Sequence, residues 1–167
     1  MRKIFFCIVL FLTGFSIGNV SCSNSDDELI TPNPPVMDPD IPPPSYPTFD
    51  YPNWSVLNCN RFEHSMTISV VLPDSLINEE QPADKLAVFV GDDCRGVADR
   101  IEISTDKHIW MAMVYGNNTS EVFYFKYYSN KTKYMYQSNK TMLFIVDGTI
   151  GTIDSPQTIG MSIVTNK

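Results

Sequence analysis

The sequence predicts an all-β protein with a single domain built as an antiparallel β-sandwich. From Trp54 onward, apolar and polar residues alternate in short runs, which is the period of half-buried strands. Turn sequences rich in Gly, Asn and Asp separate these runs, and no long amphipathic helix pattern interrupts them. About seven or eight short strands with frequent turns favour a sandwich, in which each sheet buries one face.

Residues 86–98 predict the central hairpin of this domain. Apolar side chains alternate over 86–90, and Gly91 follows as a turn residue that tolerates positive φ. Gly96 lies in the second strand and has no side chain, so another part of the chain is expected to approach it closely.

The other strands follow from the same alternation. The core-facing residues that it predicts are Met66, Ile68, Val70 and Leu72; Ile109, Met111, Met113 and Tyr115; and Phe123, Phe125 and Tyr127. Further strands are expected at 132–137 and 141–146, and Asp147-Gly148 is a turn dipeptide of the hairpin type.

The hairpin sequence also carries a resemblance. Residues 86–98 resemble the "AFVGDECRGVA" hairpin of small all-β modules in surface and secreted proteins of the Bacteroidota. Residues 114–117 with 122–128 resemble the "YGN…ITFKLYD" segment of those modules, and 150–156 resemble their "GSIDNP" close. The resemblance implies an immunoglobulin-like (Ig-like) sandwich, which in that family is an accessory domain beside a larger one.

The N-terminus predicts a lipoprotein signal peptide over residues 1–21. Arg2 and Lys3 precede the apolar run 4–15, which is shorter than the about 20 residues that a transmembrane helix needs. Cys22 follows a small residue just past this run and resembles the acylated cysteine of a bacterial lipobox. The alternative is an ordinary signal peptide followed by an unrelated cysteine.

The acidic cluster Asp26, Asp27 and Glu28 resembles the surface-export signal of Bacteroidota lipoproteins. It implies that the protein is anchored in the outer membrane and faces the cell exterior. A solvated acidic spacer is the alternative.

Residues 22–53 are expected to form an acidic, Pro-rich, disordered tether, and 54–167 the β-sandwich domain. The stretch 29–52 holds nine of the chain's 12 prolines and neither Lys nor Arg. Proline removes a backbone donor and fixes φ, so neither helix nor sheet is expected there. Such a chain is extended and semi-rigid, and it would hold the domain away from the lipid surface.

Two cysteines remain in the mature domain, Cys59 and Cys94. In an oxidising compartment they could form a disulfide, and the alternative is that each is a small buried apolar residue. Their spacing relative to the histidines does not suggest a metal site, and no cofactor is expected.

The sequence contains no recognisable nucleophile, metal or phosphate-loop motif, so we expect no catalytic residues and no enzymatic activity. Removal of residues 1–21 leaves 10 basic and 19 acidic residues, a balance that disfavours nucleic acid as a partner. Ser75 follows Asp74 and precedes Leu76, which resembles an acceptor site for O-glycosylation in Bacteroidota.

Aromatic residues predict a ligand-contact surface. If the odd-numbered residues 123–127 fill the core, their alternates face outward, and Trp110 is expected to face away from Ile109. The predicted contact residues are Trp110, Tyr124, Tyr128, Tyr134 and Tyr136. A second core face, or cross-strand packing of these rings, is the alternative.

We therefore expect a non-enzymatic surface lipoprotein, held in outer-membrane lipid through acylated Cys22, that serves adhesion or binding of a glycan or protein partner. A small extracellular enzyme or inhibitor acting on polymers, and a structural subunit of a surface complex, are the alternatives.

Overall fold

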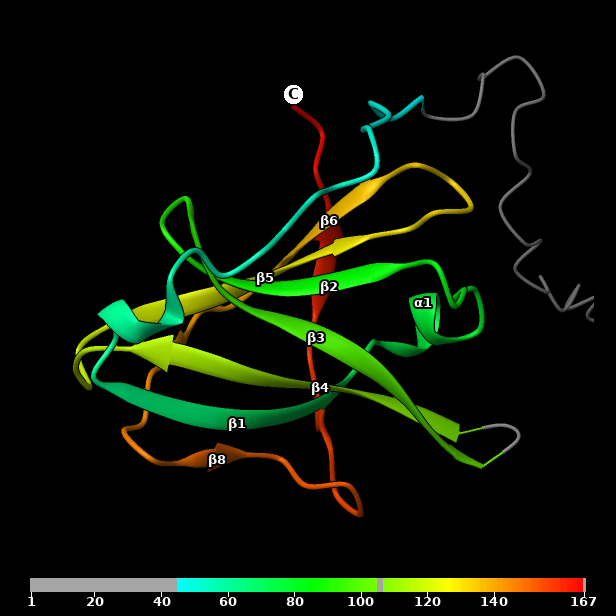
Figure 1. The fold of residues 1–167 in the computed structure, drawn as a ribbon. Coiled ribbons are helices and arrows are strands. Elements are labelled where there is room, and N and C mark those ends of the chain that lie inside the picture. Colours follow the sequence, from blue (N-terminus) through cyan, green and yellow to red (C-terminus); the bar gives the residue numbers. More distant parts are fainter. Residues whose placement is uncertain (1–44, 105–106, 167) are drawn as a thin grey trace, which may run out of the picture. The chain divides into compact units, whose positions relative to one another are not determined.

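The computed structural model describes residues 45–104 and 107–166, and this part of the chain is mostly β-structure (Figure 1). The strands are β1 (His64–Val71), β2 (Lys85–Val90), β3 (Asp93–Ser104), β4 (Lys107–Gly116), β5 (Val122–Tyr128), β6 (Met135–Ser138), β7 (Met142–Leu143), β8 (Thr149–Ile150), β9 (Gln157–Thr158) and β10 (Met161–Ile163). Among the described residues, helical structure is confined to one turn of 3₁₀ helix, η1 (Cys59–Arg61), and a single turn of α-helix, α1 (Asp74–Ile77). The prediction of an all-β protein is confirmed.

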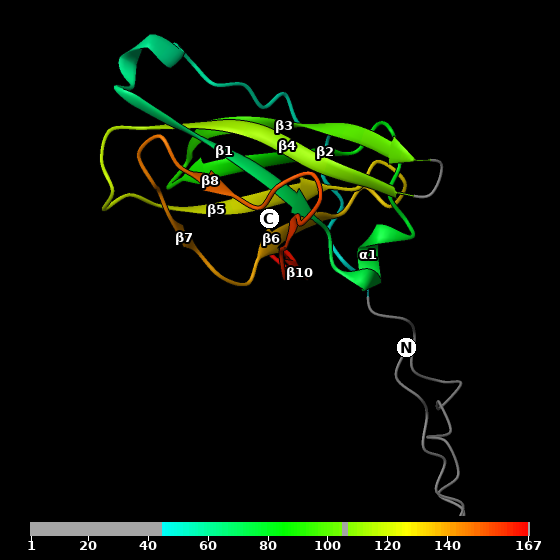
Figure 2. The same ribbon diagram turned by 90° about the horizontal axis from the view of Figure 1, so that it is seen from below.

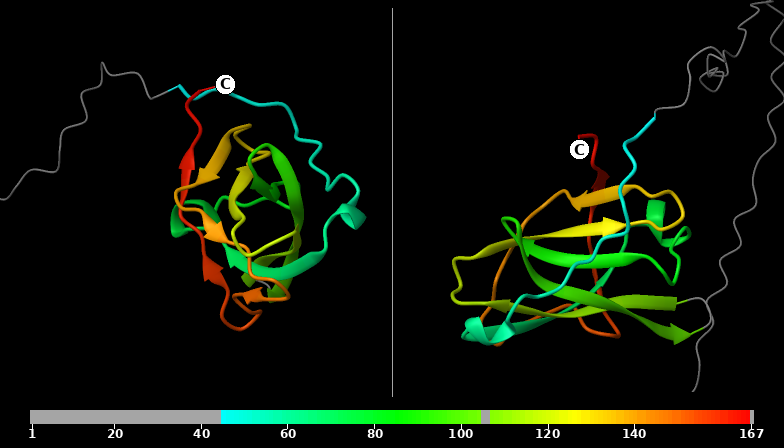
Figure 3. Two further views of the ribbon diagram at one scale, coloured as in Figure 1. Left: turned by 90° about the vertical axis from the view of Figure 1, so that its left-hand side faces the viewer. Right: turned by 45° about the horizontal axis from the view of Figure 1, so that its top comes forward.

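The strands form one curled, mixed sheet. Their order is β10-β6-β5-β2-β3-β4-β1-β8, with β7 paired to β5 and β9 paired to β1. The pairs are antiparallel, except that β8 and β9 run parallel to β1. Seen end-on, the sheet curls around an interior as a half-barrel (Figure 3). The core therefore lies on the concave face of one continuous sheet, and the expected arrangement of two separate sheets is not confirmed.

The concave face holds the main core. The predicted alternation is confirmed in β1, where Met66, Ile68 and Val70 are buried, and in β5, where Phe123 and Phe125 are buried with Tyr127. These side chains pack together with buried residues of β2, β3 and β4.

In β4 the predicted inward face is wrong for Met111, Met113 and Tyr115, although Ile109 is buried as predicted. Trp110, Ala112 and Val114 belong to the core, whereas Met113 is 53% exposed on the other face. The register explains this, because β1 pairs Val70 with Trp110 and so places both on one face of the sheet. Both faces of β4 carry apolar residues, so alternation alone could not identify the buried one.

The β2–β3 hairpin forms as predicted. Gly91 opens the two-residue turn with a φ of +57°, a conformation that suits glycine. At Gly96, an added Cβ would lie 2.6 Å from the backbone oxygen of Met113, which confirms the expected close approach. The register shifts between Val88 and Phe89, which leaves Arg95 as the extra residue of a β-bulge.

Two segments near the C-terminus tie the two sides of the half-barrel together. Residues 142–150 pair with β5 through β7 and with β1 through β8, and Phe144 between them is buried in the core. Residues 157–163 return from β1 to β6 through β9 and β10, with Ile159 buried in the core, and this segment runs behind β2, β3 and β4 in Figure 1.

An N-terminal arm, residues 45–62 including η1, lies on the convex face of the sheet. The backbone N–H of Phe49 donates a hydrogen bond to the carbonyl oxygen of Lys133, at 2.8 Å. Three aromatic rings of the arm form T-shaped, edge-to-face contacts with rings of the domain, and in each pair the ring centroids lie 5.6 Å apart. The pairs are Tyr46–Tyr134, Tyr51–Tyr128 and Trp54–Phe89. Residues 45–53 were expected to belong to the tether, but the structure places them against the domain.

Candidate functional site: a groove on the convex face

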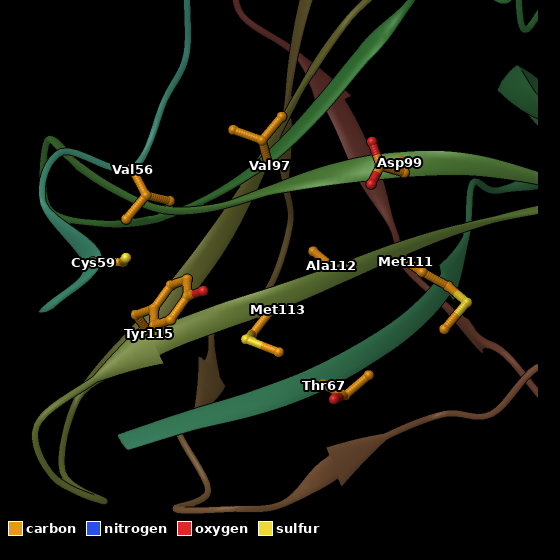
Figure 4. A pocket seen from close by; sticks show the side chains of 9 residues that line it. All are labelled: Val56, Cys59, Thr67, Val97, Asp99, Met111, Ala112, Met113 and Tyr115. Carbon is orange, nitrogen blue, oxygen red and sulfur yellow. The ribbon is translucent and has the colours of Figure 1, made fainter. Parts of the chain in front are cut away.

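A shallow groove with a volume of about 540 Å³ lies on the convex face of β1, β3 and β4 (Figure 4). The floor of the groove is formed by cross-strand neighbours: Met111 of β4 lies opposite Asp99 of β3, and Met113 of β4 lies opposite Thr67 of β1. Its lining residues are Val56, Cys59, Thr67, Val97, Asp99, Met111, Ala112, Met113 and Tyr115.

One wall of the groove comes from the N-terminal arm. Val56 and Cys59 stand over the end of the groove where Tyr115 lies (Figure 4). The ring of Phe62, just after η1, stacks on Tyr115 with centroids 6.2 Å apart and an interplanar angle of 25°. The arm and β4 therefore hold this wall together through aromatic packing.

Two arginines secure the same wall electrostatically. The guanidinium carbons of Arg61 and Arg95 lie 4.6 and 4.4 Å from the centroid of the Phe62 ring. Arg95 is 8% exposed, and its Nε lies 3.0 Å from the Asp93 carboxylate. Its Nη1 lies 3.4 Å from Glu121. Arg95, the extra residue of the β-bulge, therefore neutralises the negative charges of two carboxylates beside the groove, those of Asp93 and Glu121.

The groove combines apolar surface with a few polar groups. Met111 and Met113 present flexible, polarisable thioethers, and Tyr115 adds an aromatic ring. Thr67 and Asp99 supply a hydroxyl and a carboxylate for hydrogen bonds. A groove of this kind can bind an extended ligand with both apolar faces and hydroxyl groups.

The structure does not bring the predicted contact residues together as one exposed surface. Trp110 was expected to face outward but is 2% exposed in the core, a correction that follows from the register of β1 and β4. Tyr128 is 1% exposed, and the ring of Tyr51 in the arm packs against it.

The remaining three tyrosines are partly buried in different places. Tyr124 stacks on Phe89 and donates its hydroxyl hydrogen to the carbonyl of Gly91, at 2.9 Å. Tyr134 packs against Tyr46, and Tyr136 packs against the main core. The arm therefore covers much of the surface that the alternation of β5 had marked as exposed.

The alternation in residues 109–115 predicts that Met111, Met113 and Tyr115 face the core, so it does not reveal the groove that these residues line. The sequence offered one signal: Trp110, Ala112 and Val114 on the opposite face of β4 are also apolar, so one of the two apolar faces had to be exposed or covered by another segment.

Cys59 and Cys94 are both free, so the disulfide left open by the sequence is not formed. Cys59 is exposed at the groove, and Cys94 is buried with the outer-face residues Ala87 and Phe89. Burial raises the pKa of the Cys94 thiol above its ordinary value.

Several predicted residues lie elsewhere. Cys22, Asp26, Asp27 and Glu28 are outside the described residues. Ser75 is exposed within α1. Within residues 45–104 and 107–166, no group of three or more His, Cys, Asp and Glu side chains could hold a metal ion. The helices in this same part of the chain are too short to cross a membrane.

A second group of polar residues is buried far from the groove wall. Glu80 and Asp84, in the loop between α1 and β2, are 9% and 3% exposed. Burial raises the pKa of Glu80 to about 7. Figure 2 shows α1, next to this loop, at one end of the sheet and the turn that contains η1 at the other.

Comparison of the chain with protein-family models, with curated proteins and with solved structures found no match.

Proposed function

We propose that this protein is a non-enzymatic, lipid-anchored binding module of the outer cell surface, and that the convex-face groove binds a neutral, hydroxyl-rich polymer such as a glycan. The observation that supports the proposal is the composition of the groove, which places an aromatic ring, two thioethers, a hydroxyl and a carboxylate along one open surface. A shallow, open groove suits a polymer strand, whereas small molecules favour deeper pockets that enclose them.

The charge of the chain narrows the ligand class. Asp99 adds a negative charge inside the groove, and the chain beyond residue 21 has 19 acidic against 10 basic residues. Like charges repel, so anionic polymers are disfavoured. Hydroxyl groups of a neutral sugar can donate hydrogen bonds to Asp99 and Thr67, while the apolar face of the ring contacts Tyr115 or Met113.

The proposed anchor is the acylated Cys22, with Asp26, Asp27 and Glu28 as the export signal. The sequence order supports this: positive residues, an apolar run, the cysteine and then the acidic cluster. We also propose that the domain is a variant of the Ig-like module, a kinship supported by the β2–β3 hairpin on which the resemblance rests.

An enzyme is the second candidate, and one observation favours it: Glu80 has a raised pKa, which is common among catalytic acids. However, the Glu80 side chain is only 1% exposed and does not line the groove, so a polymer in the groove would not touch it. An inhibitor or a structural subunit of a surface complex would use the same convex face for a protein partner.

The test is retention of purified full-length protein, in detergent, on a panel of neutral and anionic polysaccharides. Met113→Glu places a charge in the groove, and we expect it to abolish retention on the polysaccharide that the wild type binds. Leu143→Glu is the matched control, because Leu143 is similarly exposed (59%) but lies on β7 outside the groove. Release of shortened chains would support the enzyme, and equal loss in both variants would contradict the groove.

A further inference from the structure

The loop 78–84 is fixed to the sheet by two buried carboxylates. Glu80 reaches β4, where the indole Nε1–H of Trp110 donates a hydrogen bond to its Oε1 at 2.9 Å. Its other oxygen, Oε2, contacts Nε2 of His108 in the same strand and lies 3.8 Å from Nε of Arg100 in β3. One carboxyl group therefore holds the loop to two strands.

Asp84 fixes the other end of the loop. It accepts a hydrogen bond from the hydroxyl of Tyr127 in β5, and its Oδ1 accepts one from the N–H of Asn130 at 2.7 Å. Its Oδ2 also accepts one from the N–H of Gln81 at 2.7 Å. Asp84 therefore accepts hydrogen bonds from three described donors, so its carboxylate is well satisfied.

The charges that face Glu80 come from every element around it. Arg100 lies in β3 and also pairs with Glu102, whose Oε1 is 3.6 Å from Nη1 of Arg100. His108 lies in β4. Asp84 lies in the loop itself, and the phenol of Tyr127 lies in β5. Tyr136 in β6 interacts with Asp84. Glu79, the neighbour of Glu80, is exposed and pairs with Lys131, so it takes no part in this contact.

We propose that Glu80 and His108 share a single proton and form a pH-sensitive latch that holds the loop 78–84 on the β3–β4 hairpin. In the closed state the neutral carboxyl group of Glu80 keeps its proton, and its O–H donates a hydrogen bond to the unprotonated Nε2 of His108. When the proton is lost to water at higher pH, a carboxylate remains buried beside Asp84, and the loop opens to solvate it.

The direction of the effect follows from the two groups. Burial, offset in part by Trp110 and Arg100, raises the pKa of Glu80 from 4.5 to about 7. The contribution of Glu80 to the stability of the closed loop is therefore complete below about pH 4.5, and it is lost as the pH rises through about 7. Burial and Arg100 lower the pKa of His108, so its contribution is present above 6.5 and is lost as the pH falls through that lowered value. The larger shift is that of Glu80, so the latch is tighter at mildly acidic than at mildly alkaline pH.

Hydrogen exchange of the loop amides tests the latch in the full-length protein. We expect the protection factors of residues 78–84 to fall by about tenfold or more between about pH 5.5 and about pH 8, since each unit of pKa shift is worth a factor of about 10. Glu80→Gln keeps the shape of the neutral carboxyl group and cannot ionise, so its protection should not change over this range. Glu79→Gln is the matched control and should behave as the wild type.

A direct titration keeps the proposal falsifiable if Glu80→Gln folds poorly. The carboxyl carbon of Glu80, followed by NMR in the wild type, should titrate near 7 and apart from the exposed glutamates. A midpoint near 4.5 would overturn the proposal, as would a loop protection that is independent of pH or that falls equally in Glu80→Gln.

Discussion

Nη2 of Arg61 lies 2.5 and 2.6 Å from the two carboxylate oxygens of Asp93, a residue 32 positions further along the chain. The contact joins the end of η1 to the first residue of β3, just after the hairpin turn. Because Val56 and Cys59 lie only a few residues before Arg61, this ion pair also fixes the chain beside the groove wall.

The two partners of this ion pair should not be equivalent. Arg61→Ala removes one exposed partner and should lower the free energy of unfolding by about 0.2–1 kcal/mol. Asp93→Ala should cost more, about 1–3 kcal/mol, because it also leaves the buried Arg95 without its nearest carboxylate. Urea denaturation of both variants measures the difference, and equal losses would contradict this account of Arg95.

Gly96→Ala should destabilise the domain by about 1–3 kcal/mol, because the added methyl group would meet the backbone oxygen of Met113 at 2.6 Å. Gly160→Ala is the control, since the nearest neighbour of its added Cβ would be the side-chain amide nitrogen of Asn139, at 3.3 Å. Thermal denaturation should show a clear fall in Tm for the first variant and little change for the second. Similar Tm values would mean that β3 and β4 can move apart at little cost.

Gly91→Val should also lower Tm, for a different reason. There is open space around Gly91, but its φ of +57° strains a β-branched side chain. Gly91→Asn is the informative comparison, because asparagine tolerates this conformation better than valine. If valine and asparagine gave the same Tm, the backbone conformation would not be the cause.

Trp110→Phe should lower the free energy of unfolding by about 1–3 kcal/mol, because it removes the N–H that pairs with the buried Glu80. Trp54→Phe is the matched substitution on the convex face, where the ring packs on Phe89, and it should cost less. Chemical denaturation compares the two, and a larger loss at Trp54 would show that the Glu80 contact contributes little.

Cys22→Ala should release the protein from the membrane fraction, since each buried methylene of an acyl chain contributes about 0.8 kcal/mol to anchoring. Replacement of Asp26, Asp27 and Glu28 by Ala should leave the protein in the membrane fraction but protected from protease added to intact cells. Membrane retention of Cys22→Ala would rule out this anchor, and unchanged protease sensitivity of the acidic-cluster variant would rule out the export signal.

The sequence was sufficient wherever only one face of a strand is apolar or where a glycine marks the backbone. β1 and the β2–β3 turn were predicted for these reasons. In β4 both faces are apolar, and only pairing with β1 decides that Trp110 is buried and Met113 exposed. Such pairing joins residues about 40 positions apart, which local alternation does not encode.

The burial of Glu80 could not be predicted either, because it also depends on contacts with residues far away in the sequence. Glu79 and Glu80 are adjacent in a loop and look alike in the sequence, yet one is exposed beside Lys131 and the other is buried beneath the loop. The arm was equally hard to foresee, because its prolines predict an extended chain but not the aromatic rings of the sheet on which that chain lies.

If the protein is anchored through Cys22 as proposed, the arm has a mechanical consequence. Tension on the anchor would enter the domain at residue 45 and would first load the contact of Tyr46 with Tyr134 and the bond from Phe49 to Lys133. These contacts follow one another along the convex face, so the arm would peel from its N-terminal end. The Arg61–Asp93 pair lies at the far end of the arm and would bear load last. The groove wall would thus keep its shape while the first contacts of the arm absorb the pull.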